Sequence, residues 1–300
     1  MSARSDLLAH MASGVTTLAR AWRVVRRDGV RFGFTDHDGD IVLGGELFKA
    51  STGLAAKALQ STTGLAVDNT EAVGALSDAG ILETDLVAGR YDGAEVTIWL
   101  LNWADPAQNM VQFRGTFGEV TRAGGAFKVD LRGQTEALNA PQGRVYQSGC
   151  DAVLGGAACK FDLGQSGFRE DMTVQSFGAD GQIVLAGNSV QSSGWFAQGR
   201  LSVATGAAAG LSGMIKVDTR LSSSSTGGGR KIVLWQSLGA DLAIGDAVQL
   251  EAGCDRSAAT CKAKFNNFAN FQGFPHIPGE DWQISYPNQG QPKDGGSLFK

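Results

Sequence analysis

The sequence predicts a mainly β protein with two β-rich domains and a short N-terminal helix. Glycine supplies 42 of the 300 residues, and these glycines separate many short apolar runs. Because average glycine usage is about 7%, the excess indicates frequent tight turns of the kind that join strands. Only the N-terminal segment combines a capping residue with clear helical periodicity. A chain of this length favours about two domains over one.

The N-terminal helix is predicted from Ser5 to Leu18, within an arm that we assign to residues 1–20. Ser5 is a suitable N-cap because its hydroxyl can accept a hydrogen bond from a backbone N–H of the first turn. The apolar residues at helical spacing are Leu7, Leu8, Met11, Val15 and Leu18.

The first β-rich domain is expected at residues 21–140. Two strands flank Arg27-Asp28-Gly29, a turn follows at residues 37–40, and a further strand comes next. Other strands are expected at residues 95–101, 110–121 and 126–131. Residues 71–79 are the candidate for a second helix, with Gly80 as its stop signal.

The second β-rich domain is expected at residues 141–285, after the Ala140-Pro141-Gln142-Gly143 boundary. Its strands are predicted at residues 172–177, 182–186, 195–203, 213–218, 231–234 and 247–250. Residues 222–229, SSSSTGGG, are interpreted as a flexible solvated connector. The polar tail at residues 286–300 is expected to be flexible alone, or to order as an arm on a neighbouring subunit.

Composition argues against several classes of function. The net charge of −4 disfavours broad nucleic-acid binding, which needs a basic surface. No run of about 18 apolar residues is present, so no transmembrane segment is predicted. The N-terminus shows no apolar signal-peptide region, which indicates synthesis in a reducing cytoplasm, where structural disulfides are unusual.

The chain offers few groups for catalysis, and we assign no catalytic residue. It has three histidines, and no hydrolase, NTPase or dinucleotide-binding motif follows a predicted strand. Asp36, His37, Asp38 and Asp40 concentrate possible acid–base or hard-metal ligands. Because Asp and Gly also favour tight turns, a turn is the favoured interpretation of this stretch, and a redox or hydrolytic site is the alternative.

Four cysteines in two distant pairs are the strongest chemical signal in the chain. They are Cys150 and Cys159, then Cys254 and Cys261. Each pair follows a Gly, has Asp after its first Cys, and has Lys after its second. Two similar half-sites suggest a single four-thiolate site that staples the second domain and holds iron or zinc. Two disulfides, or free buried thiols, are the alternatives.

The cysteine spacing favours an iron–sulfur cluster over a zinc ion. Paired zinc ligands are commonly about two to four residues apart, whereas eight and six residues intervene here. Gly149 and Gly253 would let backbone N–H groups approach the cluster sulfurs, and Lys160 and Lys262 would offset the thiolate charge. These four residues are otherwise ordinary turn and surface residues.

An aromatic segment follows Cys261. Its aromatic residues are Phe265, Phe268, Phe271, Phe274 and Trp282. Because few basic residues lie nearby, base stacking is disfavoured. A lid over the four-thiolate site is the favoured interpretation, with the interleaved Asn266, Asn267 and Asn270 bonding to the backbone.

These motifs resemble one protein family. The pattern Cys-x8-Cys … Cys-x6-Cys-x3-Phe-Asn-Asn-x2-Asn-Phe-x-Gly-Phe-Pro-x-x-Pro-Gly is similar to the tail-tip hub proteins of long-tailed phages. Within that family, it most nearly resembles the hub protein of the bacterial gene transfer agent; the lambda-type tail tip protein L is more remotely similar. The FTDHD segment at residues 34–38, Gly45 and Val67-Asp68-Asn69-x-Glu71 carry the same resemblance.

The resemblance implies a non-enzymatic structural role at the distal end of a tail. It implies a small ring, a trimer, between the distal tail protein and the central fibre-like tip protein, with a tail-associated peptidase as a further partner. It implies a [4Fe–4S] cluster held by Cys150, Cys159, Cys254 and Cys261, with zinc as the less favoured metal. The protein would assemble in the bacterial cytoplasm and then reside at the tail tip of a phage-like particle.

Overall fold

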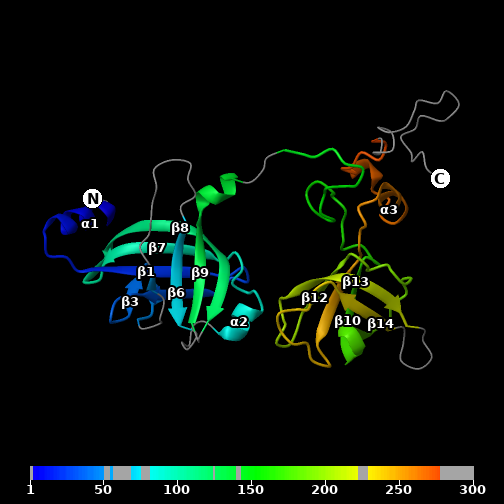
Figure 1. Cartoon of the computed structure of the whole chain (residues 1–300), viewed down its shortest axis with the longest axis horizontal. Coiled ribbons are helices and arrows are strands. Elements are labelled where there is room, and N and C mark those ends of the chain that lie inside the picture. Colours follow the sequence, from blue (N-terminus) through cyan, green and yellow to red (C-terminus); the bar gives the residue numbers. More distant parts are fainter. Residues whose placement is uncertain are drawn as a thin grey trace. The chain divides into compact units, whose positions relative to one another are not determined.

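A computed structural model describes residues 3–50, 55–56, 69–75, 82–123, 126–139, 143–221 and 229–277. The chain divides into two compact units, Met1–Pro141 and Gln142–Lys300. The predicted mainly β fold with a short N-terminal helix is confirmed, and the second unit contains a closed barrel (Figure 1). The expected tail at residues 286–300 lies outside the described residues, and so does the connector at residues 222–229, except for Gly229.

Unit 1 is built on a seven-stranded sheet in the order β2-β1-β7-β8-β9-β6-β5, with antiparallel neighbours throughout. The strands are β1 (Leu18–Val25), β2 (Arg31–Thr35), β5 (Ala55–Ala56), β6 (Asn69–Ala75), β7 (Glu95–Asn102), β8 (Asp105–Ala123) and β9 (Ala126–Gly133). Alternating residues of β1 and β7 face one core, in which Trp22 lies opposite Ile98. A separate hairpin, β3 (Ile41–Leu43) and β4 (Glu46–Phe48), packs Phe48 against Leu101.

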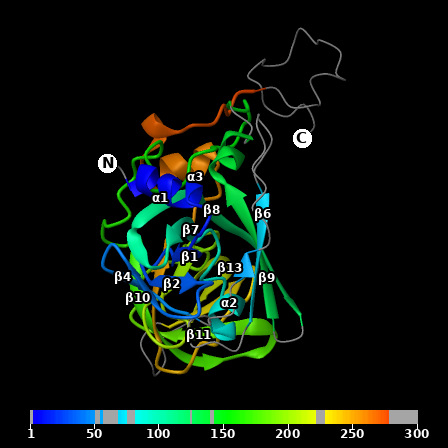
Figure 2. The same ribbon diagram turned by 90° about the vertical axis from the view of Figure 1, so that its left-hand side faces the viewer.

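The N-terminal helix is shorter than predicted. Helix α1 spans Ala3–Ala12, and Ser5 lies inside it rather than at its cap. Gly14 adopts a φ of +81°, a left-handed conformation that favours glycine, and Leu18 begins β1 by pairing with Asn102. The prediction that the helix extends to Leu18 is wrong, because the backbone of Leu18 pairs with β7. The fully buried Leu7 anchors α1 as it packs against β8 (Figure 2).

The helix predicted at residues 71–79 is also wrong over its described part. Residues 71–75 belong to β6, which pairs with β9 from Asn69↔Arg132 to Ala75↔Ala126. Residues 76–79 lie outside the described residues. Ladder hydrogen bonds to a distant strand override the local helix propensity of Glu and Ala. A short helix that the sequence did not predict, α2, follows at Glu83–Val87.

Unit 2 contains a six-stranded closed barrel in the order β10-β11-β14-β13-β12-β15. Its strands are β10 (Arg169–Phe177), β11 (Gln182–Ala186), β12 (Arg200–Val203), β13 (Ser212–Arg220), β14 (Arg230–Leu234) and β15 (Ala247–Glu251). The strand predicted at residues 195–203 is wrong in its first half, where residues 195–198 form a turn. Fully buried apolar residues fill the barrel: Leu185, Leu201, Ile215, Ile232 and Leu250.

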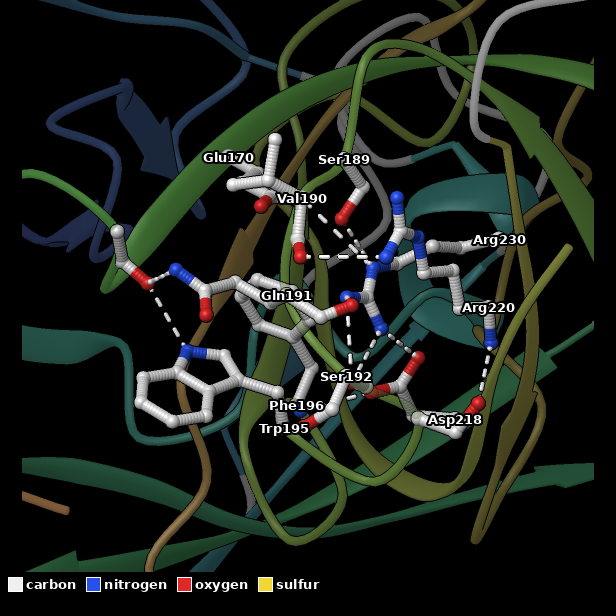
Figure 3. Close-up of polar contacts among 12 residues, drawn as sticks. Glu170, Ser189, Val190, Gln191, Ser192, Trp195, Phe196, Asp218, Arg220 and Arg230 are labelled. Atoms are coloured by element: carbon white, nitrogen blue, oxygen red, sulfur yellow. Dashed lines mark hydrogen bonds and ion pairs between the residues drawn. The ribbon is translucent and has the colours of Figure 1, made fainter. Parts of the chain in front are cut away.

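A buried ion pair ties the segment between β11 and β12 to the barrel wall (Figure 3). Arg230 Nη1 lies 2.5 Å from Asp218 Oδ1, and neither side chain is exposed. Arg230 also donates to the Ser189 hydroxyl and to the Gln191 carbonyl, each at 2.6 Å. The backbone N–H of Phe196 donates to the second carboxylate oxygen of Asp218 at 2.8 Å. The turn that follows β11 is therefore held in one conformation.

Candidate metal centre

The four cysteines lie on two segments that meet beside the barrel. Cys150 and Cys159 precede β10, whereas Cys254 follows β15 and Cys261 lies in helix α3 (Ala258–Ala263) (Figure 1). The backbone N–H of Cys150 donates to the carbonyl of Arg256 at 2.8 Å. The two half-sites are thus joined directly, although they are far apart in the sequence.

All four cysteines line one small cavity of about 20 Å³. Each thiol is free, so neither predicted pair forms a disulfide. Within the described ranges, no three His, Cys, Asp or Glu side chains are placed closely enough to hold a metal ion. The structure therefore brings the four predicted ligands around one cavity, while the metal site itself is not shown and stays a prediction.

Three of the four sulfurs accept hydrogen bonds from N–H groups of the described residues. The backbone N–H groups of Arg256 and Gln272 lie 3.4 Å from the sulfurs of Cys254 and Cys150, respectively. Asn267 Nδ2 lies 3.5 Å from the sulfur of Cys159 and also donates to the Cys159 carbonyl at 2.7 Å. Such donors stabilise thiolate charge and are typical of the surroundings of iron–sulfur ligands. The donor set therefore fits such a cluster chemically.

The thiols of Cys254 and Cys261 resist ionisation. The pKa of Cys254 is raised, and burial is the largest cause. The hydrogen bond from the Arg256 N–H lowers this pKa, whereas the negative charges of Asp255, Cys150 and Cys159 raise it further. Burial likewise raises the pKa of Cys261, followed by repulsion from the other three thiolates. A bound metal centre would replace these thiol protons, because only thiolates ligate metals strongly.

Helix α3 begins with a well-formed cap that places Cys261. The Ser257 hydroxyl accepts the Thr260 N–H at 3.1 Å. Asp255 accepts from the Ser257 N–H and from the Thr260 hydroxyl, at 2.9 and 2.8 Å. Burial alone would raise the pKa of Asp255, but these hydrogen bonds outweigh it and lower that pKa below its ordinary value. The Asp after Cys254 is thus a capping residue of the helix that carries Cys261.

A half-buried lysine near this centre, Lys264, was not predicted from the sequence. Lys264 donates from Nζ to the carbonyls of Gly253, at 2.7 Å, and Trp195. Its ammonium lies 4.5 Å from the Trp195 ring centroid. Burial lowers the pKa of Lys264 to about 8, although the charges of Cys254, Asp218 and Asp255 oppose that shift. No local pattern marks Lys264, because both carbonyls come from distant segments.

The structure gives Gly253 a role that was not predicted, whereas the roles of Gly149, Lys160 and Lys262 stay predictions. A Cβ at Gly253 would meet the Ala197 carbonyl oxygen at 1.6 Å, so this glycine permits close backbone packing. Its N–H donates to Trp195, not to a sulfur. A Cβ at Gly149 would lie 3.7 Å from its nearest neighbouring atom, which is an ordinary van der Waals distance. Lys160 and Lys262 are exposed, which agrees with the surface interpretation. The sulfur donors come from other residues.

The aromatic segment covers the cavity only in part. Phe265 and Phe271 line it, and Phe265 also packs edge-on against Phe161 with a centroid distance of 5.0 Å. Phe268 stacks on Phe271 but is 45% exposed. Phe274 does not line the cavity and packs against Tyr146. Trp282 lies outside the described residues.

Unusual backbone conformations gather near the cysteines. Among the described residues, five non-glycine residues have positive φ, and three of them lie near cysteines in the sequence: Lys160, Arg256 and Asn266. Such conformations persist only where the surroundings impose them, and they occur preferentially at functional sites.

Residues 36–40 use their side chains to accept hydrogen bonds from backbone N–H groups. The Asp36 carboxylate accepts the Arg20 N–H at 2.6 Å, and that of Asp40 accepts the Ala50 N–H at 2.8 Å. The His37 ring nitrogen Nδ1 accepts the Gly39 N–H at 3.0 Å. These contacts favour the turn interpretation, because they occupy groups that an acid–base site would need.

Comparison with known proteins identifies similar chains. Residues 4–162 match the family described as "Baseplate hub protein, N-terminal attachment domain". Residues 194–281 match the family described as "Phage conserved hypothetical protein BR0599". A chain in the solved structure titled "Virion of native gene transfer agent (GTA) particle" is 52% identical, with a TM-score of 0.87, covering 98% of this chain and 99% of that one. No curated protein matches. No helix in the described ranges is long and apolar enough to cross a membrane.

Proposed function

This chain belongs to the family of phage baseplate hub proteins, and we propose that it is a structural hub at the tail tip of a particle like the gene transfer agent. The observation that carries the proposal is the similarity over nearly the whole length of a virion chain, at 52% identity. The family match over residues 4–162 supports the same role for the first half.

We further propose that Cys150, Cys159, Cys254 and Cys261 hold an iron–sulfur cluster, of the [4Fe–4S] type. Support comes from four free thiols around one cavity and from N–H donors to three of the sulfurs. The long intervals within each pair favour a cluster over zinc. A cluster bound there would supply iron–sulfur bonds that join the two cysteine segments, and this crosslink would stabilise a protein that must stay rigid in a particle.

The assembly proposed is a ring of three copies. It would lie between a distal tail protein and a central tip protein, with a tail-associated peptidase nearby. A closed ring requires complementary surfaces on the two sides of each subunit. The chain would fold in the bacterial cytoplasm and then become part of the particle.

An enzyme that uses the cluster or residues 36–38 is the rival function. It would need a reactive group open to a substrate cavity. The side chains of Asp36 and His37 already accept hydrogen bonds from backbone N–H groups, which favours the structural role.

The decisive experiment is anaerobic purification of the full chain, followed by iron and sulfide analysis and an absorption spectrum. A [4Fe–4S] centre predicts about four irons and four sulfides per chain, with a broad visible band. Stoichiometric zinc, or no metal at all, would overturn the cluster. Light scattering should give a mass of roughly three chains for a cyclic trimer. Absence of the chain from purified particles would overturn the hub role.

A further inference from the structure

A second, larger cavity lies beside the cysteine centre on the barrel unit. This groove has a volume of about 760 Å³ and is bordered by the segment after Cys150, by β12 and β13, and by the residues around Cys254. Ligand clefts commonly measure about 300–1,000 Å³. The groove is therefore large enough to receive several side chains of a partner.

The groove presents exposed apolar side chains. Val153 is 72% exposed, and Met214 and Trp235 are each 58% exposed. Leu154 and Leu163 extend the same apolar lining. Large apolar side chains gathered at one exposed concave surface mark interaction sites, and Trp and Met are enriched there.

The apolar wall is held in place before any partner binds. The backbone N–H of Trp235 donates to the Met214 carbonyl at 3.0 Å, which fixes the backbone at this point. The Lys216 ammonium lies 5.1 Å from the centroid of the Trp235 ring. Because the Lys216 contact restricts the Trp235 ring, docking against that ring costs less side-chain entropy.

The polar part of the lining carries surplus positive charge. Arg169 and Arg200 both bind the single carboxylate of Glu251, each through Nε and Nη2. One carboxylate therefore serves two guanidinium groups, whose Nη1 atoms have no partner among the described residues. Arg256 also lines the groove, and its guanidinium makes no ion pair within the described ranges. The acidic Asp255 is already engaged in capping α3.

Strand addition is not available on this barrel. The six strands close on one another, so the barrel leaves no free strand edge for a partner to extend. A partner of the barrel therefore cannot bind by extending its sheet, whereas a groove with an apolar wall and arginines beside it suits docking through side chains.

We propose that this groove docks a segment of another tail protein in which a large apolar side chain is flanked by an aspartate or glutamate. The apolar side chain packs on Met214 and Trp235, and the carboxylate binds the surplus guanidinium groups, since planar guanidinium groups match carboxylates. The inference rests on the proposed tail-tip role but does not require the cluster.

The test is photocrosslinking in assembled particles that contain the full chain. Met214→p-benzoylphenylalanine places the probe in the groove, and Phe177→p-benzoylphenylalanine is the control on the barrel surface, since Phe177 is 49% exposed but does not line the groove. Mass spectrometry identifies the crosslinked peptide. The expected result is crosslinking from position 214, not from 177, to one acidic–apolar segment of a different tail protein.

Charge reversal then tests the carboxylate. Arg256→Glu, combined with the probe at position 214, should lower the crosslink yield at least about fivefold, which corresponds to about 1 kcal/mol. Arg256→Lys should largely preserve the yield.

Four outcomes would overturn the proposal: equal crosslinking from both positions, crosslinking to another copy of this chain, no crosslink from position 214, or an unchanged yield with Arg256→Glu. Failure of the unmodified chain to enter particles would instead overturn the hub role.

Discussion

The backbone N–H of Cys150 donates a 2.8 Å hydrogen bond to the carbonyl oxygen of Arg256. This bond joins the segment with the first cysteine pair to the loop between Cys254 and Cys261. Asn267 adds a second link through its 2.7 Å hydrogen bond to the Cys159 carbonyl. Protein contacts alone therefore bring the four thiols to the lining of one cavity, and a bound metal centre would add further bonds between the two segments.

Substitution of a proposed ligand tests the cluster most directly. Cys150→Ser should lower iron content and reduce the thermal midpoint of unit 2, because metal-binding free energy contributes to folding. Unit 1 should unfold as before. Ser148→Ala, at an exposed neighbouring position, is the matched control. Full iron content and unchanged stability in Cys150→Ser would show that Cys150 is not a ligand.

The two glycines before the cysteine pairs should respond differently to alanine. Gly253→Ala places a Cβ 1.6 Å from the Ala197 carbonyl oxygen, so we expect a loss of at least about 2 kcal/mol in the free energy of unfolding. Gly149→Ala meets its nearest atom at 3.7 Å and should change stability by less than about 0.5 kcal/mol. Urea denaturation of both variants provides the comparison. Equal effects would contradict the backbone-packing role of Gly253.

The side-chain amide of Asn267 should stabilise the proposed metal centre, because it donates hydrogen bonds to Cys159. Asn267→Asp removes the donor to the Cys159 carbonyl and sulfur and adds a negative charge. We expect a cost of about 1–3 kcal/mol in the free energy of unfolding, faster iron release to a chelator, and a changed visible spectrum. Asn266→Asp is the control, since Asn266 is exposed and Asp also tolerates its positive φ. Identical iron-release rates in the two variants would refute this role.

Lys264 should make stability depend on alkaline pH. Burial lowers its pKa from 10.5 to about 8, so between these values the unfolded chain binds more protons than the folded one. The Lys264 contribution to stability therefore rises with pH across that window. Lys264→Met should remove this contribution and flatten the slope of unfolding free energy from about pH 8 to pH 10.

The matched control for this measurement is Lys262→Met. Lys262 is exposed in helix α3, so its removal should leave the slope of the wild-type protein in place. A Lys264→Met protein with the wild-type slope would show that Lys264 does not titrate in this range.

The buried ion pair should be costly to break. Asp218→Ala removes the nearer carboxylate partner of the unexposed Arg230 guanidinium, at 2.5 Å, and leaves only Glu170 at 3.6 Å. We expect a loss of about 3 kcal/mol in the free energy of unfolding. Asp241→Ala, at an exposed position, should have little effect. Calorimetry should assign the loss to unit 2, and a loss below about 1 kcal/mol would contradict the assigned role.

Much of the fold follows from local sequence. Strand β11 occurs at Gln182–Ala186, where it was predicted, and β7 and β15 differ from their predictions by one residue. Their apolar alternation and glycine-containing turns are properties of a few neighbouring residues, so they can be recognised without a structure. The cysteine pattern likewise pointed to the family to which the chain belongs.

Other features depend on residues far apart in the sequence. Strand β6 forms where helix propensity predicted otherwise, because β9 supplies its hydrogen-bond partners. The role of Gly253 follows from the Ala197 carbonyl, and the donor to the Cys159 sulfur is Asn267. Local propensity and periodicity specify strands and turns, but backbone pairing and side-chain contacts between distant segments arise only when the whole chain folds.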